Sequence, residues 1–216
     1  SAAFVLAISP YFVAYSRMGV AEADFAAVSL AVMVLVWWLI KSKCYSHPWG
    51  AVAAGLACGV AFTINYRAYI IIALAFAWVA GWCLRKRGGR TALRQAAVMV
   101  VACAVPLLAV ELMYQLEAII AGTVRPGGEF RTYFDQLAWL ASAHGTDPPT
   151  LENWPTYLYL FGVWEGPGVL LLAAGTVAAL IRRRLIDWLV LNFFFIPMLQ
   201  WSVRGDASAW LSVVCL

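Results

Sequence analysis

The sequence predicts an all-α fold, a polytopic bundle of helices in a membrane. Of its 216 residues, 64% are hydrophobic and 12% are charged, and the mean hydropathy is +0.81. A soluble domain would carry about twice that charged fraction. Apolar runs close to or above ~18 residues, roughly the length that crosses a bilayer, recur along the chain. The alternating pattern of a membrane β-strand is missing from the sequence, so we expect helices.

The apolar runs place the helices in order. We expect spans at 1–15, 25–40, 49–64, 69–84, 95–116, 160–181, 188–203 and 209–216. The chain begins at Ser1 inside one apolar run and stops at Leu216 a few residues into another. We therefore expect residues 1–216 to be one transmembrane domain that is truncated at both ends.

Charge is divided unequally between alternate loops. One set of loops holds a single acid, Asp187, and ten basic residues: Lys41, Lys43, Arg85, Lys86, Arg87, Arg90, Arg94, Arg182, Arg183 and Arg184. The other set holds the remaining arginines and nearly all the acids: Glu22, Asp24, Glu117, Glu129, Asp135, Asp147, Glu152, Glu165 and Asp206. The positive-inside rule places the first set in the cytoplasm. We expect a multi-pass protein of the bacterial cytoplasmic (inner) membrane, with the acids outside.

A long outward loop is predicted at 117–159. It contains "FRTYFDQLAWLASA", which at helical spacing places one set of mostly apolar side chains on one side: Phe130, Tyr133, Phe134, Leu137, Leu140 and Ala141. Such an amphipathic helix lies flat on the membrane surface or roofs a cavity. The following "GTDPPTLENWP" is a turn-rich connector.

The stretch "SRMGVAEADF" is the first candidate site, because it places three charges between two apolar runs. Asp24 precedes "FAAVSLAV" and suits a helix N-cap, although a functional role is the alternative. Glu22 is less easily explained as a cap, so a functional role has more weight there. Arg17 either snorkels to the surface, pairs with Glu22 or binds an anionic group.

A second candidate site is "NYRAY" in a very short outward connection. Arg67 is costly there unless it has a partner, which is either an internal acid or an anionic ligand such as phosphate. Asn65 and Tyr66 are polar residues of the same connection, and with Arg67 they form what we call the polar hook. Glu111, near the outer end of its span, is either functional or reaches back to the interface. Arg204 also faces outward.

Other features carry less chemistry. Gly55 and Gly59 form a GxxxG pattern, which predicts a helix-packing face. The five cysteines show no CxxC pair and are interpreted as small apolar residues. His47 and His144 have no clustered partners, so no metal or other cofactor is expected, although a divalent cation between Glu22 and Asp24 stays open.

The pattern of acids and arginines at an outer surface suits a lipid-linked, anionic substrate. A carboxylate there could take the proton of an acceptor hydroxyl, and an arginine could stabilise a departing phosphate. This is the chemistry of sugar transfer from a polyprenyl phosphate. Composition alone does not separate it from transport.

Four stretches resemble the GT-C class of membrane glycosyltransferases, which use polyprenyl- or dolichyl-phosphate sugars. They are "SPYFVAYSRMGVAEADFAAVSLAV", "GAVAAGLACGVAFTINYRAYIII", "YLYLFGVWEGPGVLLLAAGTVAALIRRR" and, more loosely, "LVLNFFFIPMLQWS". The first is similar to that class's helix, "SR" turn and acid at the start of the next helix. The branch most similar is family 39, with the protein O-mannosyltransferases and aminoarabinose transferases.

The resemblance implies a GT-C core and inverting transfer of a sugar to a lipid, glycan or protein acceptor on the outer face. It implies Glu22 as an active-site acid, five residues after Arg17, where Asp is more usual, and a principal catalytic acid upstream of Ser1. "SAWLSVV" stands where the class often has "RY". Our candidates are Glu22 and Asp24 as catalytic residues, and as substrate-binding residues Arg17, Asn65, Tyr66, Arg67, Glu111 and Arg204.

The expected partners are a polyprenyl-phosphate sugar donor, a lipid or protein acceptor and membrane lipids, with no nucleic acid. Two other classes of protein stay open. One is a transporter or flippase of lipid-linked saccharides, which would keep its polar residues near the bilayer midplane. The other is a non-catalytic membrane subunit of a cell-envelope assembly.

Overall fold

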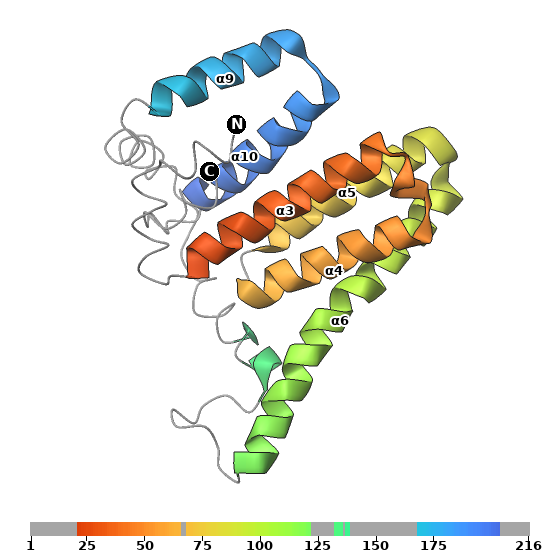
Figure 1. The fold of residues 1–216 in the computed structure, drawn as a ribbon, viewed down its shortest axis with the longest axis vertical. Coiled ribbons are helices and arrows are strands. Elements are labelled where there is room, and N and C mark those ends of the chain that lie inside the picture. The colour runs from red at the N-terminus through yellow and green to blue at the C-terminus, as the bar shows by residue number, and fades with distance from the viewer. Residues whose placement is uncertain (1–20, 66–67, 122–131, 136, 139–167, 204–216) are drawn as a thin grey trace.

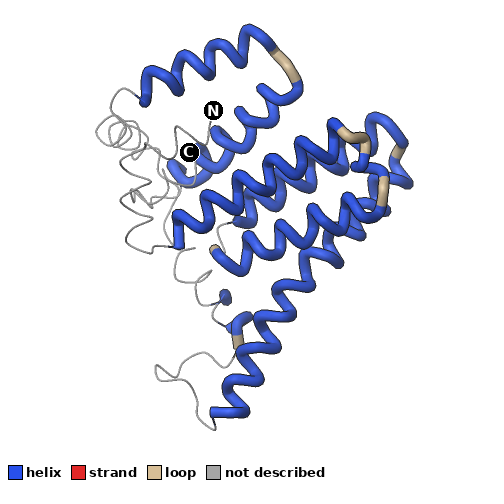
Figure 2. The backbone as a smooth tube through the Cα atoms, viewed as in Figure 1, coloured by secondary structure: helices blue, strands red, loops and turns tan. Residues whose placement is uncertain are grey.

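A computed structural model describes residues 21–65, 68–121, 132–135, 137–138 and 168–203 of the chain. The described part is helical, with short connecting turns and no strand (Figure 2). In chain order the elements are α3 (Ala21–Lys41), the 3-10 helix η1 (Cys44–Ser46), α4 (Pro48–Ile64), α5 (Tyr69–Arg87), α6 (Gly89–Ala121), α9 (Gly168–Arg182) and α10 (Leu185–Val203). The predicted all-α class is thus confirmed for these residues.

Successive helices run in opposite directions, so their connections alternate between two ends of the bundle (Figure 1). Two helical segments are long and apolar enough to cross a membrane, α5 and residues Gly89–Glu117 of α6. Shorter apolar helices at Ala27–Lys41, Pro48–Ile64, Leu170–Arg182 and Leu185–Pro197 accompany them in the described chain. The predicted spans 1–15 and 209–216 lie outside the described residues.

Two predicted helix boundaries are wrong, that of the basic loop and that at Asp24. The expected basic loop between 84 and 95 is almost entirely helical, because only Gly88, at φ 88°, separates α5 from α6. The helix α6 continues to Ala121, past the predicted start of the outward loop at 117, while its segment that is long and apolar enough to cross a membrane ends at Glu117. The bounds of the loop stay a prediction. Asp24 lies inside α3, whose first described residue is Ala21, so it is not the N-cap.

The core lies where α3, α4 and α5 meet one another, with α6 packed along α4 and α10 against α3 and α5 (Figure 1). Its largest fully buried side chains come from α3, α5, α6 and α10: Val32, Val36, Leu39, Ile71, Val79, Gln95, Met99 and Leu189. The helix α9 packs on α10.

The packing face predicted from GxxxG is confirmed. A Cβ atom at Gly55 would stand 2.5 Å from the carbonyl oxygen of Met99 and 2.7 Å from the Cβ of Ala102. One at Gly59 would meet the carbonyl oxygen of Cys103 and, at 2.9 Å, Cδ of Pro106. The two glycines therefore let the backbones of α4 and α6 approach closely, as small residues do in membrane helices.

The outer faces of α6 and α9 are strongly apolar. Their exposed large side chains include Val101, Leu108, Leu112, Met113, Ile119 and Ile120 on α6, and Leu170, Leu171, Val177 and Ile181 on α9. Apolar surface of this extent needs an apolar neighbour, which favours a membrane environment.

Candidate functional site

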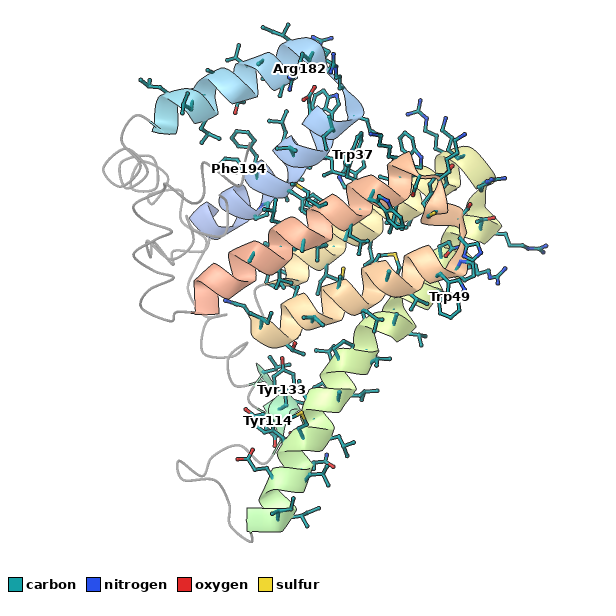
Figure 3. The ribbon with its side chains drawn as sticks, viewed as in Figure 1. Trp37, Trp49, Tyr114, Tyr133, Arg182 and Phe194 are labelled. Atoms are coloured by element: carbon teal, nitrogen blue, oxygen red, sulfur yellow. The ribbon has the colours of Figure 1, made fainter. Side chains whose placement is uncertain are left out.

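The described basic residues lie at one end of the bundle. This basic end comprises the carboxyl ends of α3, α5 and α9 and the amino ends of α4, α6 and α10 (Figure 3). All ten described Lys and Arg belong to it: Lys41, Lys43, Arg85, Lys86, Arg87, Arg90, Arg94, Arg182, Arg183 and Arg184. The charge asymmetry of the sequence is therefore an asymmetry between two ends of the folded bundle.

One acid with a described side chain, Asp187, lies at the basic end, where it closes the turn between α9 and α10. Its Oδ1 accepts a hydrogen bond from Nη2 of Arg182 at 2.6 Å, and its Oδ2 accepts one from the backbone N–H of Arg184 at 3.0 Å. Asp187 thus supports the first turn of α10. This role is structural.

The opposite end, here called the acidic end, comprises the amino end of α3, the carboxyl end of α4 and the segment 132–138 with the part of α6 that it contacts. Glu111 of α6 lies at its centre, with 8% of its surface exposed. Its Oε2 accepts hydrogen bonds from the backbone N–H groups of Tyr133 at 2.9 Å and Phe134 at 3.4 Å. Its Oε1 accepts one from Nε2 of Gln115 at 2.7 Å. Both carboxylate oxygens are engaged within the chain.

In the segment 132–138, residues 133–135 and 137–138 are helical, and the N–H groups of residues 132–135 all have acceptors. The backbone N–H of Asp135 donates to Oγ1 of Thr132 at 3.0 Å, and that of Thr132 donates to Oδ2 of Asp135 at 3.1 Å. This reciprocal pair is a capping box. Oε2 of Glu111 accepts from the two N–H groups that the capping box leaves out, those of Tyr133 and Phe134, so its negative charge lies at the positive end of the short helix.

Tyr133 makes a second set of contacts between the segment and the bundle. Its side chain is buried, and its hydroxyl lies 3.5 Å from the carbonyl oxygen of Phe62 in the last turn of α4. Its ring lies 6.0 Å from that of Tyr114 on α6 (Figure 3). Burial raises the pKa of the Tyr133 phenol, and Tyr114 raises it further, so the hydroxyl keeps its proton and donates.

The predicted site residues are placed only in part. Glu22 and Asp24 lie in the first turns of α3, although their side chains are outside the described part. Asn65 is the C-cap of α4, and its backbone N–H donates to the carbonyl oxygen of Ala61 at 3.1 Å. Four predicted residues lie outside the described residues: Arg17, Tyr66, Arg67 and Arg204.

The sequence analysis missed the partners of Glu111. Two signals were present: "TYFD" at Thr132–Asp135 has the spacing of a capping box, and Gln115 follows Glu111 by one helical turn. The amphipathic pattern did select Tyr133, which is buried, but it also selected Phe134, which is 45% exposed.

Metal ligands do not gather in the described part of the chain, where no three His, Cys, Asp or Glu residues form a group that could hold an ion. That search does not reach the side chains of Glu22 and Asp24, so the divalent cation considered there stays a prediction. Cys44, Cys58, Cys83 and Cys103 are free thiols.

No protein-family model, curated protein or solved structure matches this chain. A function for this chain therefore has to be inferred from its residues and their geometry. Two facts at the acidic end carry most weight: a buried carboxylate, and a segment of the predicted outward loop that is docked beside it.

Proposed function

We propose that this chain is the membrane domain of a multi-pass GT-C-class glycosyltransferase. It would move a hexosyl or pentosyl group from a polyprenyl-phosphate donor to a lipid, glycan or protein acceptor at the outer face of the bacterial inner membrane. In the transfer, the acceptor oxygen bonds to C1 of the sugar while the bond from C1 to the phosphate oxygen breaks. The acceptor proton goes to a carboxylate, and the phosphate leaves on its lipid.

One observation carries the proposal, the docking of the outward segment 132–138 at the acidic end of an apolar bundle. The contacts of Glu111 with Tyr133 and Phe134 hold this segment against α6, and the contact of Tyr133 with Phe62 holds it against the end of α4. A lipid-linked sugar needs such a place, with an apolar neighbour for its tail and a polar surface for its headgroup. The exposed apolar side chains of α6 supply the first.

The roles follow from chemistry. Glu22 or Asp24, in the first turns of α3, is proposed to act as general base on the acceptor. Arg67 and Arg17 are proposed to hold the phosphate, since a guanidinium matches its geometry. Asn65, Tyr66 and Arg204 complete the substrate-binding group. No cofactor is required, and a divalent cation at Glu22 and Asp24 is a variant of the same scheme.

Sugar transfer tests the proposal directly. The full-length protein in nanodiscs is given a radiolabelled polyprenyl-phosphate sugar and an extract of acceptors, and the label that leaves the donor lipid is counted. We expect Glu22→Gln to lower the rate by about 10²-fold or more, as for loss of a general base. We expect Arg67→Ala to lower it by about 10²-fold, as for loss of one group that stabilises the leaving phosphate.

Matched controls separate chemistry from expression. Glu117→Gln makes the same change on an exposed position of α6, and Arg90→Ala removes an arginine at the basic end. Both should transfer sugar normally. The proposal fails if Glu22→Gln and Arg67→Ala transfer as well as these controls. It also fails if the protein moves the intact donor across sealed vesicles without transfer, which would indicate a flippase.

A further inference from the structure

We infer that Glu111 is a latch, a positioning residue that docks the outward segment 132–138 onto the bundle by capping its helix from outside the segment. The latch itself follows from the contacts of Glu111. Its consequence for sugar transfer depends on the proposed function. Glu111 would then act on substrate only through the segment that it holds.

The first argument is the occupancy of the carboxylate. Three donors contact its two oxygens: Nε2 of Gln115 at 2.7 Å, N of Tyr133 at 2.9 Å and N of Phe134 at 3.4 Å. The side chain is 8% exposed. A general base needs an oxygen that is open to the acceptor hydroxyl. Glu111 points both of its oxygens at the chain instead.

The second argument is that a buried charge requires such partners. An ionised carboxylate away from water is costly unless hydrogen bonds compensate it, and charge-assisted bonds are the strongest available. The partners of Glu111 come from 22 and 23 residues farther along the chain. Compensation of the charge therefore requires the docked segment, and the docked segment requires an acceptor oxygen at position 111.

The third argument is the place where the segment is held. The hydroxyl of Tyr133 reaches the carbonyl oxygen of Phe62, three residues before Asn65 at the end of α4. The polar hook predicted from "NYRAY" begins at that point. The latch thus fixes the segment beside the helix end that carries the proposed phosphate-binding residues.

Hydrogen exchange of the full-length protein in nanodiscs tests the latch without any substrate. A hydrogen bond to a charged group contributes ~1.5–3 kcal/mol, so Glu111→Leu should speed exchange of the Tyr133 and Phe134 amides by about 10- to 100-fold. Peptides from α3 and α5 should exchange as in the wild type. Glu111→Gln, which keeps an acceptor oxygen and the side-chain shape, should have a smaller effect and guards against misfolding of the leucine variant.

Two matched variants serve as controls. Glu117→Gln, on the same helix, should leave exchange in the segment unchanged. Gln115→Leu removes a partner of Glu111 but keeps both backbone contacts, so its effect should be smaller than that of Glu111→Leu. If exchange at Tyr133 and Phe134 is the same in Glu111→Leu as in the wild type, the latch is refuted.

Sugar transfer gives a second readout that a purely structural role in the core would not produce. A latch predicts that Glu111→Gln keeps most of the transfer rate while Glu111→Leu loses about tenfold or more in kcat/KM, in parallel with the exchange. Loss of transfer in Glu111→Gln with unchanged exchange would make Glu111 the base and overturn the latch. If exchange is faster in Glu111→Leu but the wild type transfers no sugar, the latch is supported and the proposed function is refuted.

Discussion

A carboxylate buried among membrane-type helices must have partners, and the partners of Glu111 are the first backbone amides of a distant segment. The same N–H groups need acceptors because they begin a helix that has no preceding turn. The same hydrogen bonds therefore compensate the buried carboxylate and give acceptors to the two N–H groups. These contacts support the holding role inferred for Glu111, and its substrate-binding role stays a prediction.

Tyr133 gives a pH-dependent test at the residue scale. Its pKa is raised by burial, so the native protein holds this proton more tightly than the unfolded chain, whose tyrosine titrates at about 10. The stabilisation is complete below pH ~10 and is lost as the pH rises through the higher native pKa. We therefore expect docking of the segment to weaken only in that alkaline range.

The measurement is an ultraviolet titration of phenolate in the wild type and in Tyr133→Phe. The difference between the two curves should show one tyrosine that titrates above ~10. Tyr114→Phe is a useful comparison, because it keeps the ring but removes the hydroxyl whose electrostatic effect raises the pKa of Tyr133. That pKa should therefore fall without loss of the Tyr133 titration. A difference curve centred at or below ~10 would contradict the buried, donating hydroxyl.

The role of Glu111 could be predicted only in part from the sequence. An acid near the end of an apolar span is recognisable as a residue that needs a partner. Its partners in the distant segment are two backbone N–H groups. Every residue except proline has such a group, so no residue type in the sequence marks them. The capping-box spacing of Thr132 and Asp135 indicates where a helix begins, but not which carboxylate completes its cap.

At the scale of elements, α4 and α6 approach each other closely, and two glycines on α4 allow it. The approach is close because Gly55 and Gly59 lie one turn apart on the face that meets Met99 and Cys103. Pro106 of α6 packs over the second glycine. A side chain at either position would contact backbone atoms, which cannot rotate away.

Alanine substitution tests this packing. We expect Gly55→Ala and Gly59→Ala each to lower the free energy of unfolding by ~1–3 kcal/mol, the usual cost of overpacking. The matched control is Gly81→Ala on α5, where an added Cβ meets nothing within 4 Å. That control should gain ~0.5–1 kcal/mol, because alanine favours a helix over glycine. Thermal unfolding in detergent compares the three variants.

If Gly55→Ala and Gly59→Ala unfold at the same temperature as Gly81→Ala, the close approach of α4 and α6 is wrong. The GxxxG spacing made this face predictable from the sequence, because small residues four apart indicate close packing in membrane helices. The partner helix was not predictable, since α6 carries no matching pattern. Which helix packs against this face is decided by the arrangement of the helices in the folded bundle.

Helix ends were less predictable than helix centres. Hydropathy falls where charges appear, so the expected spans stopped at residues 84 and 116, whereas the helices continue to Arg87 and Ala121. Charged residues at the ends of a helix remain helical while their side chains extend to water. For the same reason Asp24 lies within α3 although it precedes the apolar run.

At the scale of the whole molecule, charge separates the two ends of the bundle. The positive-inside rule predicted this separation from loops alone, and the alternating direction of the helices brings the basic loops together. The catalytic centre could not be assembled in the same way. Half of its predicted residues, Arg17, Tyr66, Arg67 and Arg204, lie outside the described part of the chain, and Glu22 and Asp24 are placed only by their backbone.

The central claim is that the two ends face opposite sides of a membrane, with the acidic end outside. Single cysteines at two exposed positions test it, Ser42→Cys at the basic end and Ala138→Cys on the docked segment, in a chain whose native cysteines are replaced by alanine. A membrane-impermeant maleimide is added to intact spheroplasts. We predict that the cysteine at position 138 reacts at once, and that the one at 42 reacts only after permeabilisation. Reaction of both from the same side, or in the reverse order, would contradict the claim.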